Sequence, residues 1–306
     1  MIASAGAVAV PKSALPSRCA GSSWRGVQRR LFRDRVALLS LLGLFVLVVL
    51  AVGAPVLRLA DPYEQDLVGR LLPPAWDPEG SWVHPLGTDQ LGRDILSRVI
   101  WGARVSLLVG VSAVVISGLI GVTAGVLAGY FGGWVDNSLM RIADGQLAIP
   151  FILLVIAVIS VVGPGIEKVV PVLGVTGWVI YARVARAEVL SIREREFVLA
   201  ARASGAGAGR IILRHIQPNI LGSVAVVASV EVANVILLES SLGFLGLGVQ
   251  PPTPSWGNML GEGRDYLTTS WWLATLPGLA LAMTALSIAV LGDFLRDFLD
   301  PRSAKR

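Results

Sequence analysis

The sequence predicts an all-α membrane protein with six transmembrane helices. Hydrophobic residues make up 54% of the 306 residues and charged residues only 15%, whereas a soluble globular domain carries about 25% charged residues. Several segments hold the roughly 20 mostly apolar residues that cross a hydrocarbon core about 30 Å thick. We expect spans at 36–57, 103–127, 139–162, 172–190, 219–238 and 271–291.

Three features of these spans predict how the helices behave. The second span is rich in small residues (Gly110, Ser112, Gly118, Gly121 and Gly125), which favour close helix packing in lipid over direct contact with a substrate. Pro150 should break the third span, because proline cannot donate to the helical ladder. The sixth span opens with Trp271 and Trp272, a pair typical of the membrane interface.

The remaining segments are polar, and their basic residues predict the orientation of the chain. A membrane domain at 36–295 contains outer loops at 58–102 and 242–270 and a loop at 191–218, and it lies between tails at 1–35 and 296–306. If the N-terminus is inside, the inner segments hold sixteen Lys and Arg residues and the outer loops hold six. The positive-inside rule therefore places both termini and loop 191–218 in the cytoplasm.

Loop 191–218, which we call the elbow, has the features of a docking site. Residues 194–204 predict a short helix on which Phe197, Ala200, Ala201 and Ser204 share one face. Gly205 should end that helix, and Pro218 suits the first turn of the next one. The alternative is an amphipathic hairpin that lies on lipid headgroups, but a small-residue face is a better contact for a soluble protein.

The sequence contains no pattern of an enzyme active site or a metal site. A phosphate-binding loop needs Gly-Lys-Ser/Thr, and the three lysines, Lys12, Lys168 and Lys305, follow other residues. His84 and His215 fall on opposite sides of the membrane, and Cys19 is the single cysteine. We expect no catalytic residue, no metal, no bound cofactor and no nucleic-acid partner, since the net charge of +5 is that of basic cytoplasmic segments.

Three stretches resemble permease subunits of ABC importers. The elbow resembles their cytoplasmic loop, although Leu199 replaces the glutamate that helps to hold the coupling helix and Gln217 replaces a leucine. Two outer stretches are similar to the peptide/nickel branch of that family. The matching residues are Ala200-Ala201, Gly205 and Pro218 in the elbow; Leu86-Gly87-Thr88-Asp89 and Gly92-Arg93-Asp94 in the first outer loop; and residues 242–252 and 254–257 in the second.

The chain resembles the second, shorter permease of dipeptide and oligopeptide importers. This resemblance implies a type I ABC importer permease fold in the plasma (inner) membrane. It implies a sister permease, two cytoplasmic subunits that hold ATP and Mg, and an extracytoplasmic peptide-binding protein. The cargo stays open between dipeptides, longer peptides, glutathione-like peptides and nickel chelates. The residues expected to couple to the ATPases are Glu196, Phe197, Ala200, Ala201, Arg202 and Gly205.

Two further groups are candidate functional residues. Glu231 and Asn234 form a polar stripe in the fifth span, where they face either the translocation cavity or a hydrogen-bond partner on the sister permease. The second group lies in the first outer loop and consists of Thr88, Asp89, Arg93 and Asp94. One interpretation is that these residues touch the binding protein or an outer gate. The alternative is an ordinary loop in which Asp94 caps the next helix. An ion-coupled secondary transporter is the alternative function, but the inverted repeats and numerous intramembrane charges of that class are not evident.

Overall fold

The computed structural model describes residues 34–57 and 59–299, and every regular element among them is helical apart from one isolated bridge between Thr88 and Asp94. The predicted tails lie mostly outside these residues. The elements are α2 (Arg35–Gly53), α3 (Ile95–Phe131), α4 (Gly133–Leu147), α5 (Phe151–Val162), α6 (Ile166–Thr176), α7 (Trp178–Ile192), α8 (Glu196–Ala203), α9 (Ala208–Ile211), the π-helical turn η1 (Ile212–Ile216), α10 (Gln217–Phe244), α11 (Trp256–Gly263), the 3₁₀ turn η2 (Arg264–Tyr266) and α12 (Trp272–Leu299).

The predicted number of spans is confirmed. Among the described residues, five helical stretches are long and apolar enough to cross a membrane, and a sixth is completed if α4 and α5 form one broken span. Those two helices meet at 88°, and Pro150 stands at the break as the residue before α5. The predicted break in the third span is therefore confirmed.

Several boundaries differ from the prediction. Helix α3 begins at Ile95 instead of 103, because Asp94 accepts a hydrogen bond from Ser97 N and caps the helix eight residues early. The predicted spans leave residues 128–138 between the second and the third, but in the structure only Gly132, which has a φ of 65°, separates α3 from α4. Residues 163–171, which lie between the third and fourth predicted spans, belong to α6 from Ile166 onward.

The second outer loop is the largest difference. The sequence predicted an outer loop at 242–270, and its many Gly, Pro and Trp residues are typical of irregular structure, but α11 lies within it. Ser255 starts that helix with a capping box, in which its hydroxyl and the Asn258 side chain each bond the other's backbone N–H. Local capping therefore overrides the loop-like composition.

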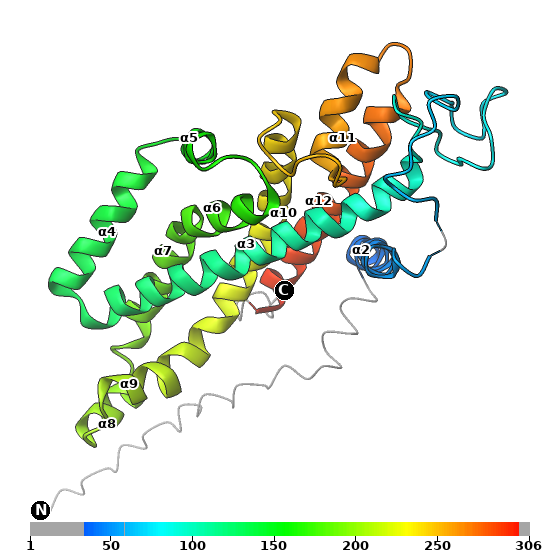
Figure 1. Ribbon diagram of the computed structural model, residues 1–306. Helices are drawn as coiled ribbons and strands as arrows, with labels where there is room; N and C mark the ends of the chain where they lie inside the picture. The colour runs from blue at the N-terminus through cyan, green and yellow to red at the C-terminus, as the bar shows by residue number, and fades with distance from the viewer. Residues whose placement is uncertain (1–33, 58, 300–306) are drawn as a thin grey trace, which may run out of the picture.

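The 37-residue helix α3 lies at the centre of the bundle and packs against α6, α7 and α10 (Figure 1). A methyl group added at Gly121 would overlap the carbonyl oxygen of Trp178, and one added at Gly125 would overlap that of Ala182. The two glycines are four residues apart, so they let the backbones of α3 and α7 touch along one face. This confirms the packing role predicted for the small residues of the second span.

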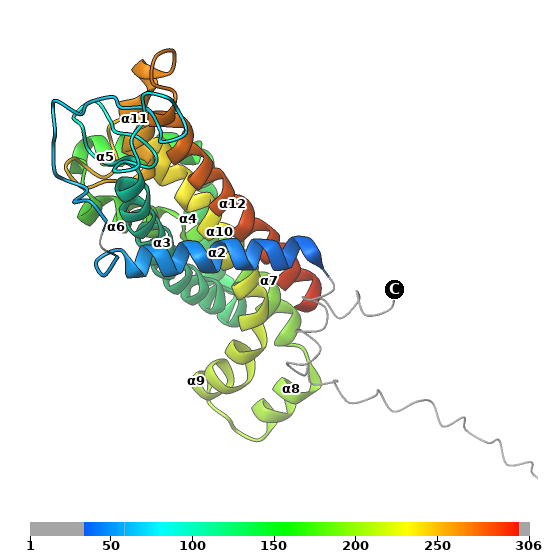
Figure 2. The same ribbon diagram turned by 90° about the vertical axis from the view of Figure 1, so that its right-hand side faces the viewer.

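The bundle has two polar ends. Figure 1 shows α8 and α9 at one end, and α11 and the first outer loop at the other. Figure 2 shows α2 crossing the long helices at a steep angle, and α2 packs on α3 and α12. We call the end with α8 and α9 the elbow end, and the end with α11 and the first outer loop the cap end.

Candidate functional site

The elbow connects α7 to α10 through three short helical elements, α8, α9 and η1. Helix α8 follows α7 after a three-residue turn, and Gly205 reverses the chain with a φ of 77°. Helix α9 and the π-helical turn η1 then lead into α10, where Pro218 occupies the first turn as predicted. Helix α8 is thus joined by short connections to α7 before it and to α10 after it.

One side of α8 is fixed to the rest of the chain. Val198 is completely buried in a cluster with residues of α3, α7, α9 and α10, and Ala201 is partly buried against the same cluster. The Arg202 guanidinium lies 5.9 Å from the ring centroid of Tyr130 at the end of α3, and the Arg193 guanidinium donates to the Gly129 carbonyl at 2.9 Å. These contacts hold α8 in a set orientation on the bundle.

The opposite side of α8 is exposed. Glu196 and Ala200 are exposed, as are Phe197 and Leu199 at 41% and 44% of their surface. Phe197 also has a tilted ring contact with His215, with centroids 6.3 Å apart. Of the face expected from the sequence, Phe197, Ala200 and Ser204 face outward, whereas Ala201 packs on its own chain. The assignment of these residues to ATPase coupling stays a prediction.

At the cap end, the four residues singled out in the sequence point inward. Thr88, Asp89, Arg93 and Asp94 each expose 4% or less of their surface. The Thr88 hydroxyl donates to the Gly69 carbonyl at 2.6 Å, and Asp94 accepts from His84 Nδ1 at 3.0 Å. Their contacts are those of residues that hold the first outer loop together. A role in docking or gating stays a prediction.

A cluster of four charged side chains, three of them buried and Glu262 20% exposed, joins the parts of the cap end. Asp89 accepts from Arg93 Nε at 2.7 Å and also from Arg98 Nη1. Glu262 accepts from Arg93 Nη2 at 2.9 Å and from Arg98 Nη1 at 3.0 Å. We call Asp89, Arg93, Arg98 and Glu262 the charge network. It connects the first outer loop, α3 and α11, and its two positive and two negative charges balance, which makes their burial tolerable.

A cavity of about 660 Å³ lies between α7, α10 and α12. Its wall combines five aliphatic side chains with the charged residues Glu188, Glu231, Asp293 and Arg296. Glu231 is half-buried and accepts from Asn234 at 3.0 Å, and Ser223 of α10 donates to Glu188 of α7 at 2.8 Å. The polar stripe predicted from the sequence is thus a hydrogen-bonded pair with one member in the cavity wall. We call this space the membrane cavity.

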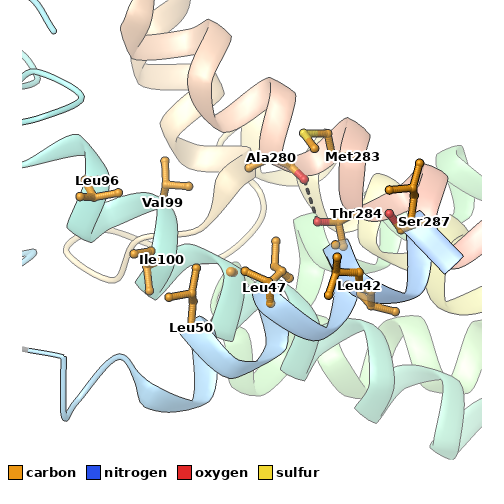
Figure 3. A pocket seen from close by; sticks show the side chains of 15 residues that line it. Leu42, Leu47, Leu50, Leu96, Val99, Ile100, Ala280, Met283, Thr284 and Ser287 are labelled. Carbon is orange, nitrogen blue, oxygen red and sulfur yellow. Dashed lines mark hydrogen bonds between the residues drawn. The ribbon is translucent and has the colours of Figure 1, made fainter. Parts of the chain in front are cut away.

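A second cavity, of about 540 Å³, lies between α2, α3 and α12 (Figure 3). Leucine, valine, isoleucine and alanine side chains make up nearly all of its wall, and the Thr284 hydroxyl donates to the Ala280 carbonyl of its own helix at 2.7 Å. No charged side chain lines it. This space can hold hydrocarbon, but it has nothing that could meet the charged ends of a peptide.

Three charged residues of the interior were not singled out in the sequence. Arg98 and Glu262 complete the charge network, and Glu239 is fully buried in α10, where its Oε2 accepts from Ser106 of α3 at 3.0 Å. Its Oε1 has no hydrogen-bond partner within the described part of the chain. The sequence did contain a signal for Glu239, because it is the single carboxyl in the apolar run before Phe244. An ionisable residue inside a membrane span is energetically costly, so it indicates a functional or structural role.

Comparison with known proteins decides the family. The model of the family described as "Binding-protein-dependent transport system inner membrane component" matches residues 121–305, which include the elbow and the membrane cavity. The chain belongs to this family. The "N-terminal TM domain of oligopeptide transport permease C" matches residues 22–74. The chain is therefore a multi-pass inner-membrane protein and a permease subunit of an ABC importer, as its elbow and outer stretches predicted.

Two relatives illustrate the similarity across nearly the whole chain. The di/tripeptide transport system permease protein DppC of Pseudomonas aeruginosa is 43% identical over 88% of this chain and 89% of its own length. The dipeptide transport system permease protein DppC of Escherichia coli K12 is 44% identical over 88% of this chain and 90% of its own length.

The solved structures give the fold. The inward-facing MetNI methionine ABC transporter has a chain that matches 66% of this one and 97% of itself, with a TM-score of 0.54 and 20% identity. A second crystal form gives a TM-score of 0.55 over 67% of this chain and 98% of that one, also at 20% identity. The predicted type I ABC importer permease fold is therefore confirmed.

Proposed function

We propose that this permease carries short peptides into the cytoplasm together with a sister permease, two ATP-binding subunits and an extracytoplasmic peptide-binding protein. The peptide cargo is supported by the relatives, whose names assign them to dipeptide and di/tripeptide transport. The family description supports dependence on a binding protein. ATP and Mg belong to the partner subunits in this proposal, and the chain itself hydrolyses nothing.

The observation that carries the proposal is the connection between α8 and the membrane cavity. Helix α8 is fixed to the bundle by Val198, and its exposed side includes Ala200 and Phe197. It follows α7 after a short turn and is connected to α10 through α9 and η1, and α7 and α10 supply most of the cavity wall. When the ATPases close on α8, both helices move and the cavity changes its access from one side of the membrane to the other. The orientation that this requires, with both termini and the elbow in the cytoplasm, belongs to the proposal.

The membrane cavity suits a small peptide in size and charge. Its volume of about 660 Å³ lies within the 300–1,000 Å³ typical of small-ligand sites. Glu231 in its wall can meet the ammonium group of a peptide as it passes. The remaining wall has five aliphatic side chains beside the polar or charged Glu188, Asn219, Ser223, Asp293 and Arg296, so it offers contacts to both apolar and polar side chains of a peptide. Such a site has low selectivity among peptides and a preference for a free amino end.

Reconstitution tests the proposal as a whole. Vesicles that contain the chain, its sister permease and both ATP-binding subunits should accumulate a radiolabelled dipeptide when ATP is enclosed and the loaded binding protein is outside. Inactivation of the ATP-binding subunits should abolish uptake. Uptake that persists after this inactivation would contradict the ATP-driven mechanism, and uptake of a nickel chelate without any peptide uptake would contradict the cargo.

A substitution at Glu231 tests the role of the cavity. Glu231→Gln should raise the KM of a free dipeptide about fivefold, because loss of one partly hydrated charge contact costs about 1 kcal/mol. The KM of an N-acetylated dipeptide should not change, because it has no ammonium group. Glu167→Gln, at an exposed residue of α6, is the matched control. Unchanged transport in Glu231→Gln, together with loss of assembly in Glu231→Ala, would instead assign Glu231 to contact with the sister permease.

A further inference from the structure

We propose that residues 74–85 are a preformed docking point for the extracytoplasmic peptide-binding protein. We call this segment the outer finger. Its exposed side chains Trp76 and Trp82 make the contact, and Asp77 and Glu79 select a basic surface on the partner. The inference rests on the proposed function, because it requires such a partner.

The outer finger is a closed loop. Ala75 N donates to the Pro85 carbonyl at 3.1 Å, which brings the two ends together. Inside the loop, Gly80 N donates to Asp77 O at 2.9 Å, and His84 N donates to Ser81 O at 3.1 Å. A side chain at Gly80 would overlap the Pro74 carbonyl, so the backbone folds tightly on itself there. Compact loops with joined ends are frequently functional.

The base of the finger is held by the buried residues of the cap end. His84 bonds Asp94 at 3.0 Å, Leu71 N donates to Asp89 O at 3.0 Å, and Leu72 N donates to the Thr88 hydroxyl at 2.9 Å. Asp89 in turn belongs to the charge network. A loop fixed in this way loses little conformational freedom on binding, and less of the interaction energy is needed to order it.

The side chains of the finger face away from the bundle. Trp82 exposes 82% of its surface, Val83 76% and Trp76 61%. Figures 1 and 2 show the first outer loop extending outward beside α11 at the cap end. Tryptophan is the side chain most enriched among the residues that dominate binding energy at protein interfaces. Two highly exposed tryptophans on one closed loop therefore indicate a contact site.

The charge around the finger favours a protein over a lipid surface. Residues 59–85 carry five acidic side chains against one arginine, Arg70, and all five acids are exposed. Such a surface is repelled by anionic headgroups, although tryptophan alone would also suit the membrane interface. An acidic surface attracts a basic patch on a soluble protein. This attraction raises the association rate of the two proteins at low salt. The acids are Asp61, Glu64, Asp66, Asp77 and Glu79.

Binding of the loaded peptide-binding protein to the complete complex, held in phosphatidylcholine nanodiscs, tests the inference. Trp76→Ser and Trp82→Ser should each raise the Kd about tenfold or more. Trp134→Ser is the matched control, because Trp134 of α4 is 81% exposed and far from the cap end in sequence. Asp77→Lys combined with Glu79→Lys should slow association and weaken its dependence on salt, whereas Asp265→Lys, outside the finger, should not.

Three results would overturn the inference. If the tryptophan variants bind as tightly as the unsubstituted complex, the finger is not the contact. If Asp265→Lys slows association as much as the paired substitution, the effect belongs to general charge. In a Cys19→Ser background, an environment-sensitive dye on Trp82→Cys should shift when the binding protein is added. A shift on phosphatidylglycerol vesicles alone would assign the finger to lipid.

The same measurements separate the docking inference from the proposed function. An unsubstituted complex that binds the loaded binding protein and takes up peptide supports the proposed function. Failure of the tryptophan variants to weaken binding would then remove only the docking inference. An unsubstituted complex that neither binds that protein nor takes up peptide would refute both.

Discussion

Asp89→Asn should loosen the cap end without altering its shape. The Asp89 side chain, in a residue that is 3% exposed, accepts from two guanidinium groups and from the backbone N–H groups of Leu91 and Arg93. Asparagine keeps the size but removes the charge, which leaves Arg93 and Arg98 buried against the single carboxylate of Glu262. Removing one partner of a buried ion pair costs about 3–5 kcal/mol. Local opening of the cap should therefore become about two to four orders of magnitude more frequent.

Amide hydrogen exchange in the assembled complex measures this opening directly. Exchange should accelerate by that factor at residues 86–98 and at α11, while α7 keeps its protection. Asp265→Asn is the matched control, because Asp265 is exposed and pairs with Arg264 at 3.3 Å. A surface pair of this kind contributes only about 0–1 kcal/mol, so the control should exchange like the unsubstituted chain.

The pairing can also be tested by a double-mutant cycle. Combining Asp89→Asn with Arg98→Gln removes one charge of each sign. The double variant should therefore lose less free energy of cap opening than the sum of the losses in the two single variants. A coupling free energy of at least 1 kcal/mol is expected for residues in direct contact. Unchanged exchange in Asp89→Asn, or strict additivity in the cycle, would refute the assignment of the charge network as the element that joins the cap.

Three further predictions follow from single positions. Gly205→Ala should destabilise the elbow by about 1–2 kcal/mol because of its φ of 77°, whereas Gly207→Ala, at a φ of −65°, should leave the melting temperature of the complex unchanged; equal effects would contradict the backbone argument. Gly125→Leu should prevent assembly, as judged by size-exclusion chromatography, because its side chain would overlap the Ala182 carbonyl, whereas Gly145→Leu has open space; an assembled Gly125→Leu complex would contradict the α3–α7 contact. In a Cys19→Ser background, a cysteine placed at Thr253 should react with an impermeant maleimide outside intact cells and one placed at Ala208 should not; the reverse pattern would overturn the orientation.

The parts of the fold that depend on local composition could be predicted from the sequence. Long apolar runs identify the spans because the hydrocarbon core sets their length. Pro150, Gly205 and Pro218 mark a break, a reversal and a helix start because each restricts or frees its own backbone. The close packing of Gly121 and Gly125 follows from their spacing in one helix. In each case the physical cause lies within a few residues of the position concerned.

The parts that depend on distant partners could not be predicted in the same way. Arg98 and Glu262 are 164 residues apart, and nothing near either one indicates the other. Asp89 and Arg93 are polar residues in an outer loop, so exposure was the simpler expectation, but a balanced set of charges can be buried. The elbow motif indicated a docking helix, while the partial burial of Ala201 depends on a cluster from four different helices.

The most direct test of the central claim is the coupling of ATP hydrolysis to peptide binding through α8. Ala200 is exposed on α8, so Ala200→Asp should leave the chain folded, inserted and assembled with its sister permease. ATP hydrolysis by the complete complex, measured with and without loaded peptide-binding protein, should lose its stimulation. Thr268→Asp, at an exposed residue of the cap end, should keep it. Full stimulation in Ala200→Asp would contradict the account, because α8 would then not be the element through which the ATPases act on the membrane cavity.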